Sequence, residues 1–305
     1  MAEKVIVFGG SGFLGSHVAD QLSDAGCEVY IFDQRASEYL REDQKMIIGD
    51  VTDRDQIRNA VKGKDYVYHF AAIADIAEAQ DNPVLTVEIN ILSTTYILDA
   101  SREFNIKRFL YGSTIYVYSD HGSFYRSSKQ ASELLIGNYH DKYGLEYTIL
   151  RYGSLYGPRA NHFNFINNII RQALLEKRIV RKGDGEETRE YIHVVDAARA
   201  SVNVISDNYK NSHVMITGTK SLRIRDLLKM IKEIFSDDIE IEYSDEHMSG
   251  HYNITPYIFK PIVAKKFILN YYHDLGQGIL EQIYSIYEEL DKNGEVNHVE
   301  EFPKK

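Results

Sequence analysis

The stretch Val5-Ile-Val-Phe-Gly-Gly-Ser-Gly-Phe-Leu-Gly15 decides the fold that this sequence predicts. Its first four residues are apolar and mostly β-branched, which is typical of a buried strand. Glycines follow at positions 9, 12 and 15, and residues 13–22 then carry apolar side chains at helical spacing. A strand, a glycine turn and a helix in this order make a phosphate site, because glycine allows a tight turn and the helix N-terminus attracts an anion.

A second apolar run supports this interpretation. Residues 28–32 are followed by Asp33, roughly 20 residues beyond the glycines, where a dinucleotide-binding fold places the carboxylate that binds a ribose. Glycines alone also occur in ordinary surface turns, so the strand, the helix and the acid carry the argument together. Asp33 favours NAD over NADP, since a carboxylate repels a 2′-phosphate, and the nearby Arg35 weakens that preference.

Size and charge limit the function classes. The 305 residues suffice for one large or two smaller cores, and 44% hydrophobic with 26% charged residues is typical of a globular protein. The net charge of −10 argues against a nucleic-acid partner or an anionic membrane surface. An anionic substrate must therefore meet positive groups that are placed locally.

Cysteine, histidine and hydropathy patterns point to a cytoplasmic protein without a metal. Cys27 is the only cysteine and fits a reducing compartment. The 11 histidines form no metal-ligand pattern. No apolar run reaches the length of a membrane span, and the chain leads directly into a strand, so we expect no signal peptide.

Strand and helix patterns alternate through the first half of the chain. We expect further strands at 46–50, 66–72, 107–112 and 146–152, and helices at 53–61, 84–104 and 124–143. Thr52 is the expected cap of the second helix, and the third is expected to bury a stripe of Leu85, Ile89, Leu92 and Tyr96. The alternation predicts an α/β fold with a doubly wound parallel sheet, which binds ligands beyond the carboxyl ends of its strands.

The alternation loosens after residue 158. Residues 164–177 and 224–235 are expected to be helical, and residues 178–181, 214–216 and 239–243 extended. We expect a dinucleotide-binding Rossmann domain over residues 1–158, with a later return around 188–205. A smaller, mainly substrate-binding domain is expected over residues 159–305.

A tyrosine and a lysine four residues apart form the predicted catalytic pair. Tyr125 and Lys129 project from one face of a helix that follows the fifth strand. The lysine ammonium is expected to favour the phenolate and lower its pKa toward neutral pH, which suits proton transfer. A hydroxyl of Ser113 or Thr114 is expected to hold the substrate oxygen.

The motifs resemble the extended short-chain dehydrogenase/reductase family, and more narrowly its nucleotide-sugar epimerases and dehydratases. The resemblance runs to about residue 290. The motifs that carry it, in chain order, are Gly9-x-x-Gly12-x-x-Gly15, Asp33, Gly49-Asp50-Val51, His69-Phe-Ala-Ala72, Ser113-Thr114, Tyr125-x-x-x-Lys129, Arg151-Tyr152, Leu155-Tyr-Gly-Pro158 and Thr188-Arg-Glu-Tyr-Ile-His-Val-Val-Asp196.

The resemblance implies NAD as the cofactor and a role for each matching residue. Tyr125 would be the acid/base, Lys129 would hold the nicotinamide ribose, Thr114 would orient the sugar hydroxyl and Arg189 would meet the substrate diphosphate. The residues that would surround NAD are Gly9, Gly12, Phe13, Leu14 and Gly15 at the pyrophosphate, Asp33 at the ribose, Asp50 and Val51 at the adenine, and Phe70, Ala71 and Ala72 along the nucleotide.

The sequence departs from the family pattern in four ways. The segment between Thr114 and Tyr125 is short, so the rim of the site is expected to be open or differently built. Ile115 and Tyr116 stand where the dehydratases have an Asp-Glu pair. The asparagine after the Arg-Tyr strand is replaced by Gly153 or Ser154. No arginine stands around 250–256, where the family often has one for the diphosphate.

The resemblance therefore implies an NAD-dependent enzyme that epimerises a nucleotide sugar, and we expect a UDP-hexose changed at C4 through a transient keto-sugar. The alternatives are a dehydratase or related lyase that uses another acid/base pair, such as Asp75, Tyr116 or His121, and a keto-sugar reductase. A catalytically silent NAD-binding sensor or scaffold is the alternative of another class. The helices at 84–104 and 127–143 are expected to pair in a homodimer.

Overall fold

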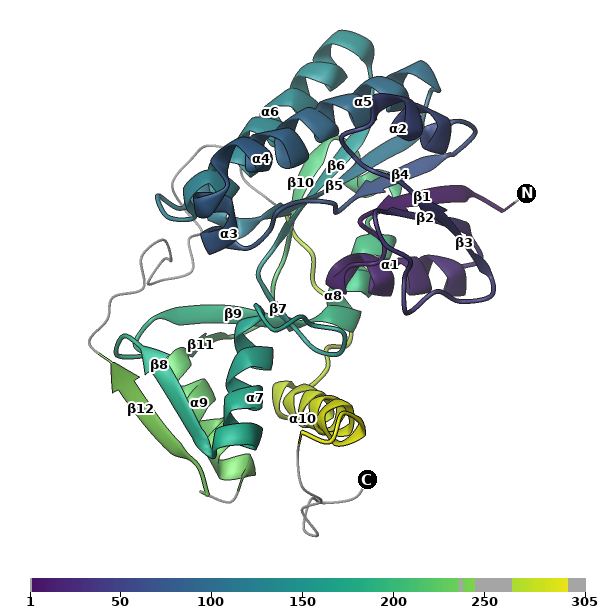
Figure 1. Cartoon of the computed structure of the whole chain (residues 1–305). Helices are drawn as coiled ribbons and strands as arrows, with labels where there is room; N and C mark the ends of the chain where they lie inside the picture. The colour runs from purple at the N-terminus through teal and green to yellow at the C-terminus, as the bar shows by residue number, and fades with distance from the viewer. Residues whose placement is uncertain (1, 236–237, 245–264, 296–305) are drawn as a thin grey trace.

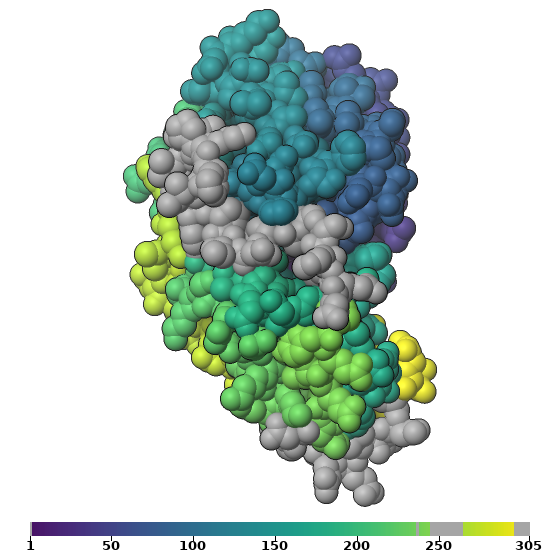
Figure 2. Space-filling view, turned by 90° about the vertical axis from the view of Figure 1, so that its left-hand side faces the viewer, coloured from purple at the N-terminus to yellow at the C-terminus, as the bar shows by residue number. Residues whose placement is uncertain are grey.

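The computed structural model describes residues 2–235, 238–244 and 265–295 (Figure 1). A large sheet with helices on both faces carries most of the N-terminal half, and a smaller group of strands and helices lies beside the carboxyl ends of its strands. The side view shows the same division, with N-terminal residues at one end of the surface and residues of the green and yellow range at the other (Figure 2).

In the described part of the chain, eight strands form one sheet in the order β13-β10-β6-β5-β4-β1-β2-β3, and every neighbouring pair is parallel. This confirms the predicted doubly wound sheet. The strands are β1 (Lys4–Phe8), β2 (Glu28–Asp33), β3 (Gln44–Ile48), β4 (Tyr66–His69), β5 (Arg108–Thr114), β6 (Tyr147–Tyr152), β10 (Ser212–Ile216) and β13 (Lys265–Lys266).

Helices cover both faces of this sheet, which is why β5 and β6 are buried along their whole length. One face packs against α1 (Phe13–Asp24) and α8 (Val194–Asn203). The other packs against α2 (Arg54–Val61), α5 (Ser93–Glu103) and α6 (Ser123–Tyr143). Each face has its own hydrophobic core, so the sheet is a rigid frame for the residues at its carboxyl edge.

The expected cap of α2 is wrong. Asp53, not Thr52, accepts hydrogen bonds from the backbone N–H groups of Asp55 and Gln56, both at 3.0 Å. The Thr52 hydroxyl instead donates to the Asp50 carboxylate at 2.9 Å.

The helix expected at 84–104 is divided, and its buried side is not the predicted one. A π-helical turn (Glu88–Leu92) joins α4 (Pro83–Val87) to α5. Thr86, Asn90 and Thr94 are buried, whereas Leu85 and Leu92 of the predicted stripe are about two-fifths exposed, at 43% and 41%. The prediction was wrong because polar side chains find hydrogen-bond partners on α6 and in the loop after β4, and their burial turns the apolar stripe outward.

The second part of the fold has two small sheets, made by β7 (Ser154–Tyr156), β9 (Thr188–His193) and β11 (Ser221–Arg223), and by β8 (Arg178–Lys182) and β12 (Glu240–Ser244). The helices α7 (Phe165–Glu176), α9 (Ile224–Ile234) and α10 (Leu275–Lys292) pack around one shared apolar core. The sequence did not lead us to expect α10, nor the short helix α3 (Ile76–Asp81) after β4.

The later chain returns to the large sheet with α8 and β10, and again with β13. Helix α8 packs beside α1, in the region where a return around 188–205 was expected, and β10 then pairs with β6. Among the described residues, no helix is long and apolar enough to span a membrane. The segment 250–256, where a late arginine is absent, and the polar residues 296–305 lie outside the described residues, while Asp291 and Lys292 still belong to α10.

Candidate active site

The glycine turn is built as the sequence predicts. Gly9 has a φ of +77°, which favours glycine, and a Cβ there would lie 2.5 Å from the backbone nitrogen of Ala71. A Cβ on Gly15 would lie 2.2 Å from the Gly9 carbonyl oxygen. Among the described residues no side chain caps α1, which begins after Gly12. The turn therefore forms a backbone cradle that faces the uncapped start of a helix, which suits a pyrophosphate.

A cavity of about 650 Å³ opens beside this cradle. Its walls contain most of the predicted cofactor residues, namely Gly9, Gly12, Asp33, Asp50, Val51, Phe70, Ala71 and Ala72. Phe13 lines the adjoining, larger cavity together with Asp33. Leu14 packs on the core and Gly15 is buried against the turn. The shape of this region fits a dinucleotide.

The Asp33 carboxylate lies at the carboxyl end of β2. It accepts hydrogen bonds from the backbone N–H of Ser11 at 3.1 Å and of Arg35 at 3.4 Å. These contacts hold the carboxylate against the glycine turn, at the mouth shared by the two cavities. A ribose hydroxyl at that point would meet a fixed acceptor.

Tyr125 and Thr114 meet at a second cavity, of about 290 Å³. Thr114 is the last residue of β5, and Tyr125 lies in the first turn of α6. Burial raises the pKa of Tyr125 to about 12, while a hydrogen bond with Thr114 acts in the opposite direction. The two hydroxyl groups therefore form a linked pair beside a space of sugar size.

Lys129 is close to Tyr125 but does not act as expected on its pKa. The ammonium donates to the carbonyl oxygen of Gly112 at 2.8 Å, and it lies 5.9 Å from the centre of the Tyr125 ring. Burial lowers the pKa of Lys129 to about 7, so its charge is only partly present at neutral pH. The expected lowering of the Tyr125 pKa is thus wrong for this structure, because desolvation of the phenol outweighs a weakened cation.

The structure distinguishes the two candidate hydroxyl groups. Ser113 points away from the cavity and donates to the Glu133 carboxylate at 2.6 Å. Thr114 lines the cavity and also caps the next 3-10 turn (Ile115–Tyr118), accepting from the backbone N–H of Tyr116 at 3.2 Å. Thr114 is therefore the hydroxyl that can reach a substrate.

Two buried arginines line the same cavity. Arg189, on β9, was predicted from the sequence, and its side chain donates to the carbonyl of Thr188 at 2.9 Å. Arg181, on β8, was missed. Its guanidinium pairs with Glu187 and lies 5.0 Å from the centre of the Phe165 ring. Nothing in the local sequence distinguishes Arg181 from a solvent-facing strand residue, because only the folding of β8 onto the cavity buries it.

The positions of the dehydratase acid pair carry no carboxylate here. Ile115 is buried in a small apolar cluster, and Tyr116 lines the cavity with its ring 6.4 Å from that of Tyr125. Of the other acid/base candidates, Asp75 also lines the cavity, but its carboxylate caps α3 by accepting from Glu78 N–H at 2.8 Å. His121 is exposed and is not part of the wall.

The short connection before Tyr125 packs closely on its own residues. It runs from the 3-10 turn through Gly122, whose φ of +101° starts α6, and a Cβ on Gly122 would lie 2.9 Å from the Tyr116 ring. Arg126 donates to the carbonyl of Ser119 at 2.7 Å. Gly122 therefore lies directly against the ring of Tyr116, which itself lines the cavity.

Asn90 is a further residue that sequence reasoning missed. It lies in the π-helical turn, where its side chain binds both the backbone N–H of Ile73 at 2.8 Å and the hydroxyl of Ser128 at 2.9 Å. It thereby ties the loop after β4 to the α6 turn that carries Lys129. π-helical turns often occur at functional sites, but no residue pattern in the sequence predicts one here. Asn90 could therefore be found only from the structure.

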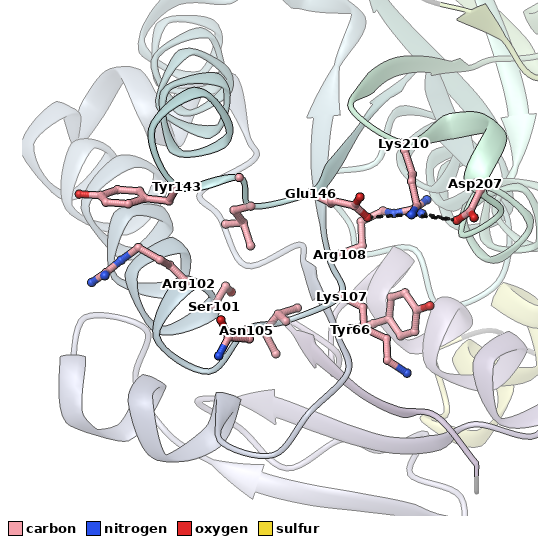
Figure 3. A pocket seen from close by; sticks show the side chains of 13 residues that line it. Tyr66, Ser101, Arg102, Asn105, Lys107, Arg108, Tyr143, Glu146, Asp207 and Lys210 are labelled. Atoms are coloured by element: carbon pink, nitrogen blue, oxygen red, sulfur yellow. Dashed lines mark hydrogen bonds and ion pairs between the residues drawn. The ribbon is translucent and has the colours of Figure 1, made fainter.

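Another cavity, of about 490 Å³, lies at the amino ends of β5 and β6, whereas Thr114 stands at the carboxyl end (Figure 3). Its charged groups are largely paired: Lys210 binds Glu146 at 3.1 Å and Asp207 at 3.3 Å, and Arg108 binds Asp207 at 3.1 Å (Figure 3). None of the predicted site residues lines it. In the described ranges, no group of His, Cys, Asp or Glu could hold a metal ion.

Comparisons with known proteins agree with this geometry. The model of the NAD dependent epimerase/dehydratase family matches residues 5–217. A protein of Methanocaldococcus jannaschii named as a UDP-glucose 4-epimerase is 31% identical over 250 residues, which cover 75% of this chain and 81% of that protein. A UDP-N-acetyl-alpha-D-glucosaminuronate decarboxylase of Bacillus cytotoxicus is 28% identical over 271 residues, covering 80% and 82%.

Solved structures show the same architecture. A UDP-N-acetylglucosamine 4-epimerase from Methanobrevibacter ruminantium, in complex with UDP-N-acetylmuramic acid, has a TM-score of 0.83 and 27% identity, covering 95% of this chain and 100% of that chain. A UDP-glucose 4-epimerase from Thermotoga maritima, with UDP-glucose, has a TM-score of 0.79 and 25% identity, covering 94% and 99%.

Proposed function

The chain belongs to the NAD-dependent epimerase/dehydratase family, and from this premise we propose that it epimerises a UDP-hexose at C4 through a transient keto-sugar. The observation that carries the proposal is the pairing of Tyr125 with Thr114 on the wall of a small cavity that also holds Arg189. Relatives named as UDP-sugar 4-epimerases support the choice of reaction.

The residues at the glycine turn fit NAD. The turn accommodates no Cβ at Gly9 or Gly15, and the fixed Asp33 carboxylate suits a ribose hydroxyl and disfavours a 2′-phosphate. Gly12, Phe13 and the backbone of Leu14 would meet the pyrophosphate. When bound, NAD supplies the group that accepts a hydride from the sugar and returns it.

Tyr125 moves the proton in the proposed reaction. Oxidation of the sugar alcohol breaks its O–H and C–H bonds, and the proton of the hydroxyl goes to Tyr125 Oη. Thr114 holds the same oxygen and keeps it aligned. Because the pKa of Tyr125 is about 12 in this structure, its base form needs positive charge nearby, and we assign this role to the protonated form of Lys129, which lies 5.9 Å from the ring centre. The proton returns to the sugar oxygen after the keto-sugar has turned its other face.

The substrate diphosphate is assigned to Arg189. A guanidinium binds phosphate with two parallel hydrogen bonds and keeps its charge when buried. Arg189 and Arg181 give this wall of the cavity the local positive groups that a chain of net charge −10 requires. Residues 159–305, which contribute both arginines, are accordingly proposed as the mainly substrate-binding domain.

The site favours epimerisation over dehydration. Elimination of water needs an acid and a base beside the sugar ring. Ile115 is apolar and buried, Tyr116 has no carboxylate, and Asp75 is engaged as a helix cap. The complete set of Thr114, Tyr125 and Lys129 equally disfavours a silent NAD-binding sensor.

The test is to incubate the purified protein with UDP-glucose, UDP-N-acetylglucosamine and their galacto isomers in D2O, and to follow the anomeric signals by NMR. We expect one pair to interconvert without deuterium entering the product. Deuterium in a deoxy or unsaturated product would indicate a lyase instead. No change in any pair would remove the proposal.

A homodimer is also proposed. Apolar side chains are exposed over α4, the π turn and α6, which pack beside one another: Val84 is 79% exposed, Val87 48% and Leu134 64%. Figure 1 shows α4, α5 and α6 together on one outer face of the sheet. A second copy of this chain is the partner that would cover these side chains.

A further inference from the structure

A buried ion pair lies directly behind the proposed catalytic lysine. Glu133 follows Lys129 by one turn of α6, and Arg151 lies on β6 beside it. The Arg151 guanidinium donates to the Glu133 carboxylate from Nε at 3.0 Å and from Nη2 at 2.5 Å. The side chains of Glu133 and Arg151 are only 7% and 2% exposed. A buried pair of this kind contributes little net stability, so its presence here suggests another role.

The pair also holds the end of β5. Ser113 donates to Glu133 at 2.6 Å, and Arg151 binds the hydroxyl of Tyr118 in the turn that follows Thr114. Because neighbouring residues of a strand point to opposite faces, anchoring Ser113 to α6 directs Thr114 toward the cavity and Tyr125. The carboxylate therefore links the strand that presents Thr114 to the helix that presents Tyr125.

The surroundings of Lys129 make Glu133 its counter-charge. The groups that face Lys129 are the Gly112 carbonyl and the Tyr111 ring on β5, His69 on β4, and Tyr125 and Glu133 on α6. His69 has a pKa lowered to about 3 by burial and is neutral. Among the described residues, Glu133 is the carboxylate whose charge raises the pKa of Lys129 against the effect of burial.

The groups around Glu133 are Arg151 on β6, Ser113 and Tyr111 on β5, Tyr147 on β6 and His213 on β10. Burial lowers the pKa of His213 to about 4, and its ring nitrogen lies 3.8 Å from the carboxylate. His213 is therefore neutral at neutral pH, and Arg151 is the cation that pairs with the Glu133 carboxylate.

We propose that Glu133, held by Arg151, is a positioning residue: it fixes Ser113 so that Thr114 meets Tyr125, and it supplies a negative charge that favours the protonated form of Lys129. The inference rests on the proposed function, because it assigns a role within the same site. The positioning of Ser113 depends on the shape of the Glu133 side chain, and the effect on Lys129 depends on its charge. Substitutions can change these two properties separately.

Three variants separate these properties. Glu133→Gln keeps the shape and removes the charge, Glu133→Asp keeps the charge and shortens the side chain, and Ser113→Ala removes the anchor on β5. The matched control is Glu103→Gln. It removes the carboxylate charge from an exposed ion pair, between Glu103 on α5 and Arg58 on α2. Lys129 is titrated by NMR with [13Cε]lysine, assigned through the loss of its signal in Lys129→Met, and kcat is measured against pH.

The two readouts are expected to diverge. In Glu133→Gln the midpoint of Lys129 falls by about one pH unit or more, and the alkaline limb of the kcat profile moves down with it. In Glu133→Asp and Ser113→Ala the midpoint stays within a few tenths of a unit, while kcat falls about three- to tenfold and KM is unchanged. Glu103→Gln changes neither readout.

An unchanged Lys129 midpoint in a folded Glu133→Gln protein overturns the charge role. Wild-type kcat in both Glu133→Asp and Ser113→Ala overturns the positioning role, and these two variants decide the matter if Glu133→Gln does not fold. The Lys129 titration needs no substrate, so it still gives an answer if no tested sugar is turned over, which is the outcome that would count against the proposed function alone.

Discussion

The ammonium of Lys129 lies 5.9 Å from the centre of the Tyr125 ring and donates its hydrogen bond to the Gly112 carbonyl instead. One helical turn separates the two residues, so their nearness follows from the sequence. Their protonation does not. Burial raises the pKa of the phenol to about 12 and lowers that of the amine to about 7, so at neutral pH the phenol is neutral and the amine is only partly charged.

Replacing Tyr125 by Phe is expected to reduce kcat by roughly 10²- to 10⁴-fold, the usual contribution of a general acid/base. Binding of NAD is expected to persist, because the phenol only touches one end of the proposed site. Epimerisation is measured by NMR, and bound NAD by mass spectrometry of the denatured protein. Tyr143→Phe, at the exposed end of the same helix, serves as the control. Unchanged biological activity of Tyr125→Phe with intact NAD binding would favour the alternative that the protein is a catalytically silent NAD-binding sensor.

Lys129→Met is expected to be more stable than the wild type at pH 6 to 7. The difference in stability between the two proteins is expected to shrink at higher pH. The pKa of Lys129 is lowered in the folded state, so its charge destabilises the fold by a few kcal/mol below pH 7. Between about pH 7 and its ordinary value of 10.5 the unfolded state binds more protons, and wild-type stability rises. The Tm of both proteins is compared from pH 6 to 10.

Lys142→Met, which changes an exposed lysine of the same helix, is expected to alter Tm equally at every pH. A Tm difference between Lys129→Met and wild type that stays constant over this range would contradict the burial of a charged Lys129.

Replacing Asp33 by Ala is expected to weaken NAD binding about tenfold or more, because a charged hydrogen bond to the ribose is lost. Binding of NADP is expected to tighten, since the repulsion of its 2′-phosphate is removed while Arg35 remains. Equilibrium binding of both cofactors is measured by calorimetry, with Glu42→Ala on the nearby surface as the control. Equal losses for NAD and NADP would show that Asp33 only supports the turn.

Two glycine-to-alanine changes are expected to have opposite effects. Gly15→Ala places its Cβ 2.2 Å from the backbone oxygen of Gly9, so the turn must move and NAD content should fall together with Tm. Gly137→Ala lies within α6 with no atom within 4 Å of its Cβ, and should stabilise the protein by about 0.5–1 kcal/mol. Normal NAD content in Gly15→Ala would argue against the cradle.

Charges placed on the proposed dimer face are expected to separate the subunits. Leu134→Lys and Leu92→Glu each put a charge among the apolar side chains of α6 and the π turn, where burial in an interface would be costly. The sedimentation mass should fall from two chains to one. Ile268→Glu, at a residue that is 68% exposed elsewhere, should leave it unchanged. A wild-type mass equal to one chain would contradict the dimer.

Much of the fold and of the candidate site could be predicted from patterns of residues that are close together in the sequence. The glycine turn, the acid after the second strand and the Tyr125–Lys129 spacing depend on residues that are near in sequence, and each appears in the structure where its pattern predicts. The helix predicted at 84–104 is present apart from its π-helical turn, but its buried side was predicted wrongly, for a physical reason. Its polar residues, Asn90 among them, are buried by partners distant in sequence, which no periodicity of that segment contains.

By itself, the sequence determined the alternation of strands and helices in the N-terminal half, the parallel sheet and the glycine turn, because these follow from side-chain periodicity and from the conformational freedom of glycine. Only the tertiary structure decided that Thr114 rather than Ser113 meets Tyr125, that Arg181 joins Arg189, and that Glu133 and Arg151 lie behind Lys129. Those relationships depend on which strands become neighbours, and on how burial then shifts each group between its charged and neutral forms.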